Sequence, residues 1–130
     1  MFDRYIIVDD TLRNTTENGE VTGFAFDARC GYYRRLILSM VEDLAVTVNG
    51  TAVDPAQVSL ELRGMTRPLA DLSGEFVEAW EFGEIATVVV SRPGGLAPGE
   101  HEIGLREQLR ISYLPFPHTP ETVQTLAVHA

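Results

Sequence analysis

Side chains that could ligate a metal ion are few and widely spaced in this sequence of 130 residues. Cys30 is the single cysteine. The three histidines, His101, His118 and His129, do not have the close spacing that zinc ligands show. We therefore expect this chain itself to hold no metal ion and no other cofactor.

Carboxylates are abundant, but their pattern points to no catalytic pair. The adjacent pairs Asp9-Asp10 and Glu42-Asp43 would point to opposite faces of a strand. Cys30 follows an arginine, which could lower the pKa of its thiol, yet no histidine is close to it in sequence. We interpret Cys30 as a buried structural thiol and expect no catalytic residue on this chain.

Residues 29–35 concentrate three arginines and two tyrosines in one short segment. Tyrosine and arginine are enriched at the centre of binding interfaces, because they offer rigid rings and bidentate hydrogen-bond donors. The residues that we predict to face a partner or a substrate are Tyr32, Tyr33, Arg34 and Arg35, with His118 as a further candidate. The competing interpretation is a strand with one buried tyrosine and solvent-exposed arginines that pair with nearby glutamates.

The charge balance excludes several classes of function. The chain has 19 acidic and 10 basic residues, a formal net charge of −9, which argues against nucleic-acid and anionic-membrane partners. Every basic residue is an arginine, so lysine Schiff-base and P-loop chemistry are excluded. The first ten residues do not resemble a signal peptide, and no stretch approaches the length of an apolar membrane span. A cytoplasmic protein is expected.

The hydrophobic pattern that must position these residues has a period of two, which is typical of β-strands. Alternating segments are found at residues 24–29, 44–48, 58–63, 102–106 and 109–113. Residues 35–41 and 85–90 are apolar on both faces and predict central or covered strands. Trp80 and Phe82 alternate with a glutamate, so we expect a strand there, with both aromatic rings in the core.

Turn residues separate these segments at intervals of about ten residues, a spacing typical of a sandwich or barrel. Asn18-Gly19 and Asn49-Gly50 are strong hairpin signals. The sequence therefore predicts an all-β protein, a single-domain antiparallel β-sandwich over residues 1–116. Prolines at positions 115, 117 and 120 would interrupt a ladder, so residues 117–130 are expected to form an irregular C-terminal tail packed on the domain or on a partner.

An ordered set of short motifs resembles the β-subunits of C-glycoside deglycosidases. The motifs are residues 18–27 (NGEVTGFAFD), 32–34 (YYR), 38–43 (LSMVED), 46–50 (VTVNG), 80–87 (WEFGEIAT), 93–101 (PGGLAPGEH) and 109–115 (LRISYLP). Together they extend through almost the whole chain in one order.

The resemblance implies an accessory β-sandwich subunit that assembles with a larger α-subunit, a TIM barrel that holds a divalent metal, with manganese the expected ion. Such complexes are lyases that cleave 3-keto C-glycosides of flavonoid-type aglycones by elimination. A ketone at sugar C3 acidifies the C2 proton, a base removes that proton, and the aglycone then leaves C1.

Two alternatives remain open at this point. The first is a stand-alone carbohydrate-binding module, with Tyr32, Tyr33 and Trp80 as a platform on which a sugar stacks. The second is a structural interaction module that self-associates through exposed strand edges.

Overall fold

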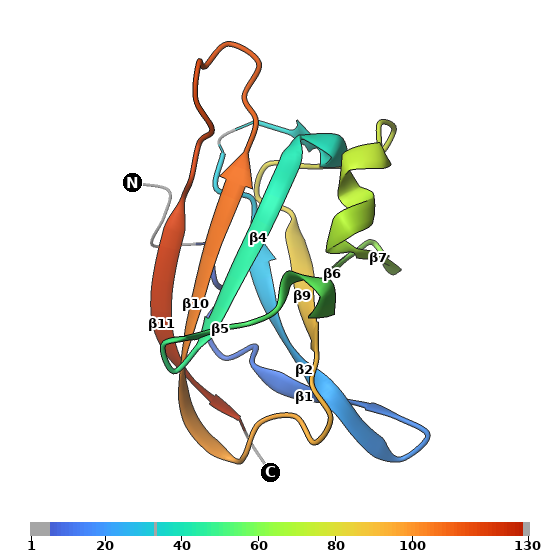
Figure 1. Ribbon diagram of the computed structural model, residues 1–130, viewed down its shortest axis with the longest axis vertical. Coiled ribbons are helices and arrows are strands. Elements are labelled where there is room, and N and C mark those ends of the chain that lie inside the picture. The colour runs from blue at the N-terminus through green and yellow to red at the C-terminus, as the bar shows by residue number, and fades with distance from the viewer. Residues whose placement is uncertain (1–5, 33, 129–130) are drawn as a thin grey trace.

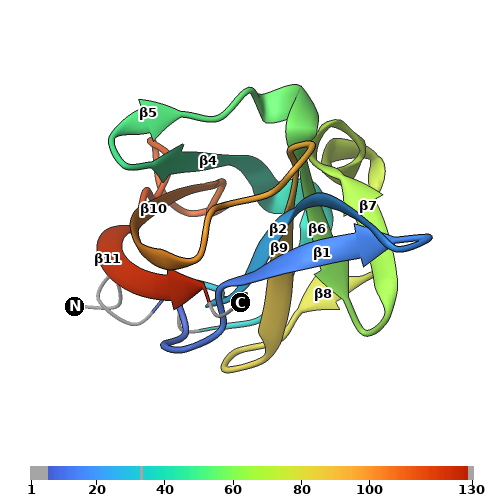
Figure 2. The same cartoon turned by 90° about the horizontal axis from the view of Figure 1, so that it is seen from below.

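The two sheets of the protein are antiparallel and face each other (Figures 1 and 2). The computed structural model describes residues 6–32 and 34–128. One sheet has the order β1 (Arg13–Glu17), β2 (Glu20–Arg29), β9 (Ile85–Ser91), β6 (Val58–Leu62) and β7 (Met65–Pro68). The other has the order β11 (Glu121–Val128), β10 (Gly99–Leu109), β4 (Val41–Val48) and β5 (Thr51–Ala52). The predicted all-β sandwich is confirmed.

A short additional pair of strands closes one end of the sandwich. Strands β3 (Leu36–Ile37) and β8 (Ala79–Trp80) pair with each other alone. The remaining regular elements in the described part of the chain are the 3₁₀ helices η2 (Leu38–Met40), η3 (Pro55–Gln57) and η4 (Leu69–Gly74). No helix in these ranges is long and apolar enough to cross a membrane.

Alternate side chains of the two sheets meet in one hydrophobic core. Phe24 and Phe26 of β2 and Val88 of β9 pack inward from one sheet, and Val46 of β4 and Leu105 of β10 do so from the other. Each of these five side chains is at most 1% exposed. Burial of this apolar surface is the main term that stabilises the two-sheet arrangement.

Two predicted hairpins form as the sequence indicated. Asn18 and Gly19 join β1 to β2, and Asn49 and Gly50 join β4 to β5, all four with positive φ. Positive φ at both central residues is the conformation of a type I′ turn, which matches the twist of the strands. A third hairpin of this kind, between β6 and β7, has Arg63 in the first position with φ 51° and was not signalled by the sequence.

Three segments differ from the prediction. The expected strand over residues 35–41 is β3 followed by the 3₁₀ helix η2, and β4 begins only at Val41. The expected strand through Trp80–Phe82 ends at Trp80, because Gly83 with φ 80° turns the chain directly into β9. The alternating segment 109–113 leaves the sheet at Leu109, where the loop between β10 and β11 begins.

The prediction of an irregular tail over residues 117–130 is wrong for residues 121–128. These residues form β11, which pairs along β10 from Gly99 to Arg106. The prolines that suggested irregularity all precede the strand and lie in the loop that projects at the top of Figure 1. Strand β11 lies at the edge of its sheet, so several of its residues are polar and exposed. Its core contacts come from Leu126 and Val128, which are buried.

The close approach of β2 to β9 gives a test of this register. A Cβ atom on Gly23 would lie 1.9 Å from the backbone oxygen of Val90, whereas a Cβ on Gly74 would meet nothing within 4 Å. Gly23→Ala should therefore lower the free energy of unfolding by about 1–3 kcal/mol or more, since backbone cannot move aside easily. Gly74→Ala should leave it unchanged or raise it by up to about 1 kcal/mol. Urea denaturation of both variants measures this, and equal effects would contradict the pairing.

Candidate functional site

A surface cavity of about 280 Å³ lies at the end of the sandwich where the β10–β11 loop projects. Two segments far apart in sequence form its walls, one from residue 32 to residue 40 and the other from residue 110 to residue 113. The lining residues are Tyr32, Arg34, Arg35, Leu36, Ile37, Met40, Arg110, Ile111, Ser112 and Tyr113. The cavity therefore joins cationic and phenolic groups to an apolar floor.

Three of the residues predicted from sequence are brought together at this cavity. Tyr32, Arg34 and Arg35 all line it. Tyr32 is buried, and its hydroxyl is hydrogen-bonded to the hydroxyl of Tyr113, while the two arginines are exposed. Tyr33 lies outside the described residues. The juxtaposition is what a recognition surface needs, and the role of each side chain in binding stays a prediction.

His118, the fifth predicted residue, supports the cavity from the side. Its Nε2 donates a hydrogen bond of 2.9 Å to the carbonyl oxygen of Gly31. Its ring meets the ring of Tyr32 edge-on, with centroids 6.0 Å apart and an interplanar angle of 62°. Leu109 and His118 also exchange two backbone hydrogen bonds of 2.8 Å at the base of the β10–β11 loop. His118 thus positions Tyr32 and is not among the residues that line the cavity.

A buried carboxylate fixes the two walls relative to each other. Glu107 of β10 is fully buried, and its Oε1 accepts the backbone N–H of Gly31 at 2.7 Å. The backbone N–H of Glu107 donates to the carbonyl oxygen of Pro120 at 2.9 Å. A Cβ on Gly31 would lie 2.3 Å from the ring of Pro120, so the glycine allows this close contact. The segment that carries Tyr32 is therefore held against both ends of the loop.

The whole wall over residues 110–113 was missed by sequence reasoning. These residues were assigned to a regular strand, in which alternate side chains would have pointed inward and outward. The chain instead turns after Leu109, and the backbone N–H of Arg110 donates to the carbonyl oxygen of Met40 at 2.8 Å. No local signal could reveal this contact, because it joins segments 70 residues apart.

Cys30 is a buried thiol, as expected. It is 6% exposed, and burial, followed by the nearby Glu107 carboxylate, raises the pKa of its thiol to about 12. A thiol in this state is protonated at neutral pH and is a poor nucleophile. Cys30 therefore belongs to the core behind the cavity.

The sugar-stacking platform of Tyr32, Tyr33 and Trp80 is not formed, because Trp80 is completely buried. Its indole Nε1 donates a hydrogen bond of 2.8 Å to the carbonyl oxygen of Glu84. Trp80 therefore lies in the core as predicted. The same prediction is wrong for Phe82, which is 64% exposed in the turn between β8 and β9.

Metal-ligating groups do not converge in the part of the chain that the structure describes. Within residues 6–32 and 34–128, no group of three or more histidine, cysteine, aspartate or glutamate side chains could hold a metal ion.

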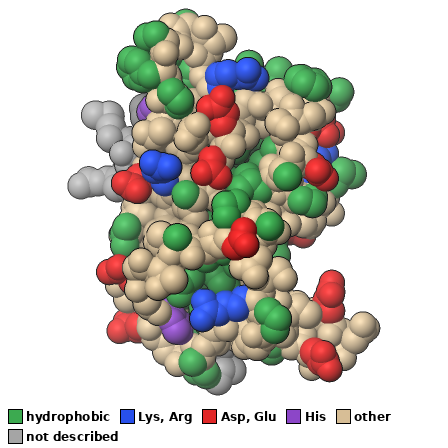
Figure 3. Space-filling model, in the orientation of Figure 1, with side chains coloured by type: hydrophobic (Ala, Val, Ile, Leu, Met, Phe, Trp, Pro, Cys, Tyr) green, Lys and Arg blue, Asp and Glu red, His purple; other side chains and the backbone are tan. Residues whose placement is uncertain are grey.

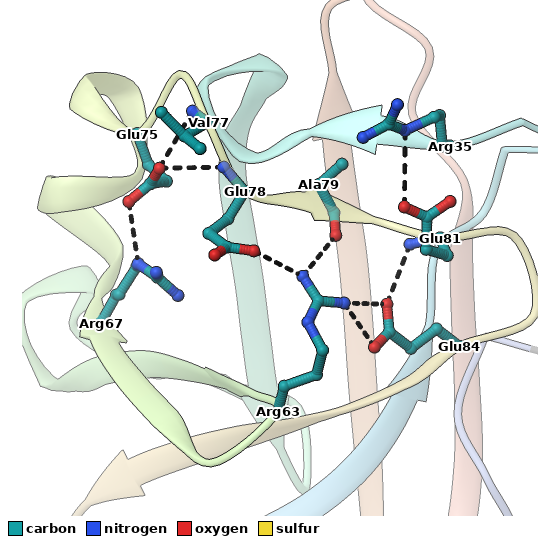
Figure 4. A network of polar contacts seen from close by, with 9 residues as sticks. All are labelled: Arg35, Arg63, Arg67, Glu75, Val77, Glu78, Ala79, Glu81 and Glu84. Atoms are coloured by element: carbon teal, nitrogen blue, oxygen red, sulfur yellow. Dashed lines mark hydrogen bonds and ion pairs between the residues drawn. The ribbon is translucent and has the colours of Figure 1, made fainter.

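A network of ion pairs connects the β6–β7 turn to the cavity (Figure 4). Arg63 binds the carboxylates of Glu84, at 2.5 and 2.6 Å, and Glu78, at 2.9 Å, and it also donates to the carbonyl oxygen of Ala79. Glu84 Oε1 accepts the backbone N–H of Glu81 at 3.0 Å. Glu81 in turn lies 3.4 Å from the guanidinium of Arg35.

The second part of the network holds the segment before β8. Glu75 pairs with Arg67 at 3.3 Å, and its other oxygen accepts the backbone N–H groups of Val77 and Glu78. The backbone N–H groups of Leu38 and Ser39 in η2 donate hydrogen bonds to the carbonyl oxygens of Glu78 and Glu75, which places this segment beside the cavity wall. The network thus orients residues 75–84, which carry the exposed side chains of Phe76, Val77 and Phe82.

Two glutamates of the network have lowered pKa values. The backbone N–H of Glu78, then that of Val77, lowers the pKa of Glu75 below its ordinary value of 4.5, with help from Arg67. Partial burial acts to raise the pKa of Glu84, but hydrogen bonds from Arg63 and from the Glu81 N–H outweigh it, so the net shift is also downward. Both carboxylates are therefore stabilised in the ionised form by the fold.

These shifts predict the pH dependence of stability. Because the pKa of each carboxylate is lower in the folded than in the unfolded chain, its contribution is complete above about pH 4.5 and is lost as the pH falls through the lowered pKa. As the pH is lowered below about 4.5, the urea midpoint of Glu75→Gln should fall less steeply than that of the unmodified protein. Ser73→Ala, a neighbouring exposed change without a titratable group, should keep the original pH dependence. Identical slopes in all three proteins would contradict the assignment.

Exposed apolar side chains surround the cavity. Tyr113 and Phe116 in the β10–β11 loop are 61% and 64% exposed, and Ile37, which lines the cavity together with Tyr113, is 37% exposed. Hydrophobic side chains gather at this end in the space-filling view, over the projecting loop and at the opposite upper edge (Figure 3). Clusters of exposed large apolar side chains mark sites of protein association or ligand binding.

Fold and site together define a small all-β domain with a cationic and aromatic cavity at one end. Comparison of its sequence with known families identifies the family to which it belongs. The profile of the C-glycoside deglycosidase beta subunit family matches residues 2–113. The chain therefore belongs to the C-glycoside deglycosidase beta subunit family, as its motifs indicated.

Individual relatives agree with this assignment. The chain is 37% identical over 121 residues to the "3'-dehydrocarminate deglycosidase beta subunit" of Microbacterium sp, an alignment that covers 92% of this chain and 86% of the relative. It is 32% identical over 98 residues to the "C-glycoside deglycosidase beta subunit" of Eubacterium cellulosolvens, covering 75% of this chain and 67% of that protein. Both relatives are thus named as one subunit of an enzyme with more than one kind of subunit.

Proposed function

We propose that this chain is the accessory β-subunit of a C-glycoside deglycosidase, a lyase complex whose reacting groups belong to a TIM-barrel α-subunit. The observation that carries this proposal is membership of the beta subunit family over residues 2–113. The name of the Microbacterium relative gives its substrate as a 3′-dehydro glycoside, which supports a 3-keto sugar as the substrate here. In this proposal the β-subunit stabilises the barrel and forms one wall of the substrate cleft.

The proposed reaction is an elimination across C1 and C2 of the sugar. The C3 ketone acidifies the C2 proton, and a base of the α-subunit takes that proton. The electron pair left at C2 forms the C1–C2 double bond as the bond from C1 to the aglycone breaks. The aglycone carbon leaves with the bonding pair and receives a proton. A divalent cation, manganese in our expectation, is assigned to the α-subunit, where it would supply Lewis-acid stabilisation.

Exposed groups at the cavity end support docking of the α-subunit there. Tyrosine, arginine and other large side chains dominate the energy of protein interfaces when they are buried on association. Tyr113, Phe116 and Ile37 are large and exposed, Arg34 and Arg35 line the cavity, and Arg35 also belongs to the network of Figure 4. The short backbone hydrogen bonds at the base of the loop pre-organise these groups, which reduces the entropy lost on binding.

Co-expression with the candidate barrel subunit tests the proposed function. We expect the two chains to purify together and to turn over a 3-keto C-glycoside. The 130-residue chain alone should be inactive. The barrel alone should lose most of the activity and recover it when this chain is added. Turnover by this chain alone, full activity of the barrel alone, or failure to form a complex would each overturn the proposal.

Arg34→Ala tests the proposed docking surface. Truncation of an interface arginine commonly weakens binding by more than 1 kcal/mol, so we expect an increase of about fivefold or more in the Kd of the complex or in the KM for the glycoside. The melting temperature should not change, because Arg34 is exposed. Arg92→Ala, at the opposite end of the sandwich in the β9–β10 loop, is the matched control. Unchanged assembly together with unchanged turnover would remove Arg34 from the surface.

A further inference from the structure

The cavity has a chemical character that docking alone does not explain. Its apolar floor and its tyrosines are suited to a planar ring, since aromatic rings stack on and pack against such groups. Its volume of about 280 Å³ is close to the lower limit of small-molecule sites, roughly 300 Å³. The space is therefore of the right size for one substituted ring system.

The charge of the cavity is opposite to that of the protein. The chain has 19 acidic and 10 basic residues, yet three of the ten arginines, Arg34, Arg35 and Arg110, line this one cavity. None of its described lining residues is an aspartate or a glutamate. A local excess of guanidinium groups in an acidic protein favours an anionic ligand, because it concentrates positive potential at one place.

Arg110 is the arginine best placed to bind that anion. The hydrogen bond from its backbone N–H to Met40 fixes its position at the cavity wall. Within the described ranges, its exposed guanidinium forms no ion pair with a carboxylate. Arg35 does have a partner, Glu81, but at 3.4 Å and with both side chains more than half exposed, so a ligand can compete for it.

We propose that this cavity binds an aromatic carboxylate. The planar guanidinium group of arginine matches a carboxylate with two parallel hydrogen bonds, which a compact ammonium group cannot do. This inference rests on the proposed function and narrows it: the complex would take C-glycosides whose aglycone carries a carboxylate on its ring, and the β-subunit would hold that end of the substrate.

Ligand binding by the full-length chain tests the proposal directly. The probes are benzoate and 4-hydroxybenzoate, with benzyl alcohol and 4-hydroxybenzyl alcohol as uncharged counterparts. A charge-assisted hydrogen bond contributes about 1.5–3 kcal/mol, so each acid should bind about tenfold more tightly than its alcohol in calorimetric or NMR titrations. Equal affinity for acid and alcohol, or no binding of either, would overturn the proposal.

Two variants of Arg110 and one matched control localise the binding. Arg110→Gln should weaken binding of the acids about tenfold. Arg110→Lys should give an intermediate loss, since it keeps the charge but not the two-pronged geometry. Arg106→Gln removes an exposed arginine of β10, four residues before Arg110, that does not line the cavity, and it should leave binding of the acids within about twofold. Equal effects of Arg110→Gln and Arg106→Gln would show a general charge effect and overturn the site.

The assembled complex separates this inference from the proposed function. Two 3-keto C-glycosides that differ only in a carboxylate on the aglycone serve as substrates, and Arg110→Gln should raise the KM of the acidic one about tenfold relative to the neutral one. If the complex is active and Arg110→Gln does not change the ratio of the two KM values, the carboxylate site is overturned and the β-subunit function is not. If the chain binds the aromatic acids but forms no complex with the barrel, the β-subunit function is overturned and the carboxylate site is retained.

Discussion

One buried hydrogen bond joins the two parts of the chain that form the cavity, namely that from the Gly31 N–H to the carboxylate of Glu107. A carboxylate without exposure to water is unfavourable unless hydrogen bonds and neighbouring groups compensate for its lost solvation. Strand β10 places Glu107 behind residues 30–32, while its own backbone N–H binds the far end of the β10–β11 loop at Pro120. Both walls of the cavity therefore depend on the position of a single residue in the longest strand.

The surroundings of the cavity are organised by charges that are mostly exposed. Individual exposed ion pairs contribute little to stability, but a guanidinium group with several fixed acceptors restricts the geometry of the segments that carry them. Arg63 does this for the chain around β8, and the positive φ of Arg63 at the tip of a type I′ hairpin directs its side chain there. The network in Figure 4 therefore orients a surface more than it stabilises a fold.

Periodicity and turn chemistry predicted the sandwich because both are local signals. The alternation of β2, β4 and β6, the two-sided apolar pattern of β9 and the Asn-Gly hairpins were visible in the sequence. The edge strand β11 was missed because half of its residues face water and prolines precede it. The Arg63-Gly64 turn was missed because arginine is uncommon at positive φ.

Of the two walls of the cavity, the sequence predicted one, which carries Tyr32, Arg34 and Arg35. The composition of residues 29–35 pointed to Tyr32, Arg34 and Arg35, and these line the cavity. The opposite wall depends on a backbone contact between Arg110 and Met40 that no pattern of neighbouring residues encodes. Trp80 and Phe82 illustrate the same limit: one glycine turns the chain between them, so that one ring is buried and the other is exposed.

The arginines at the cavity indicate which kind of occupant it favours. The core of a protein interface is depleted of charged residues, with arginine as the exception. Three arginines line one recess, no carboxylate is among its described lining residues, and Arg35 is balanced in part by Glu81 at 3.4 Å. An anion bound in the recess is attracted by these guanidinium groups. The electrostatics of the cavity therefore favour an anionic occupant over a neutral one.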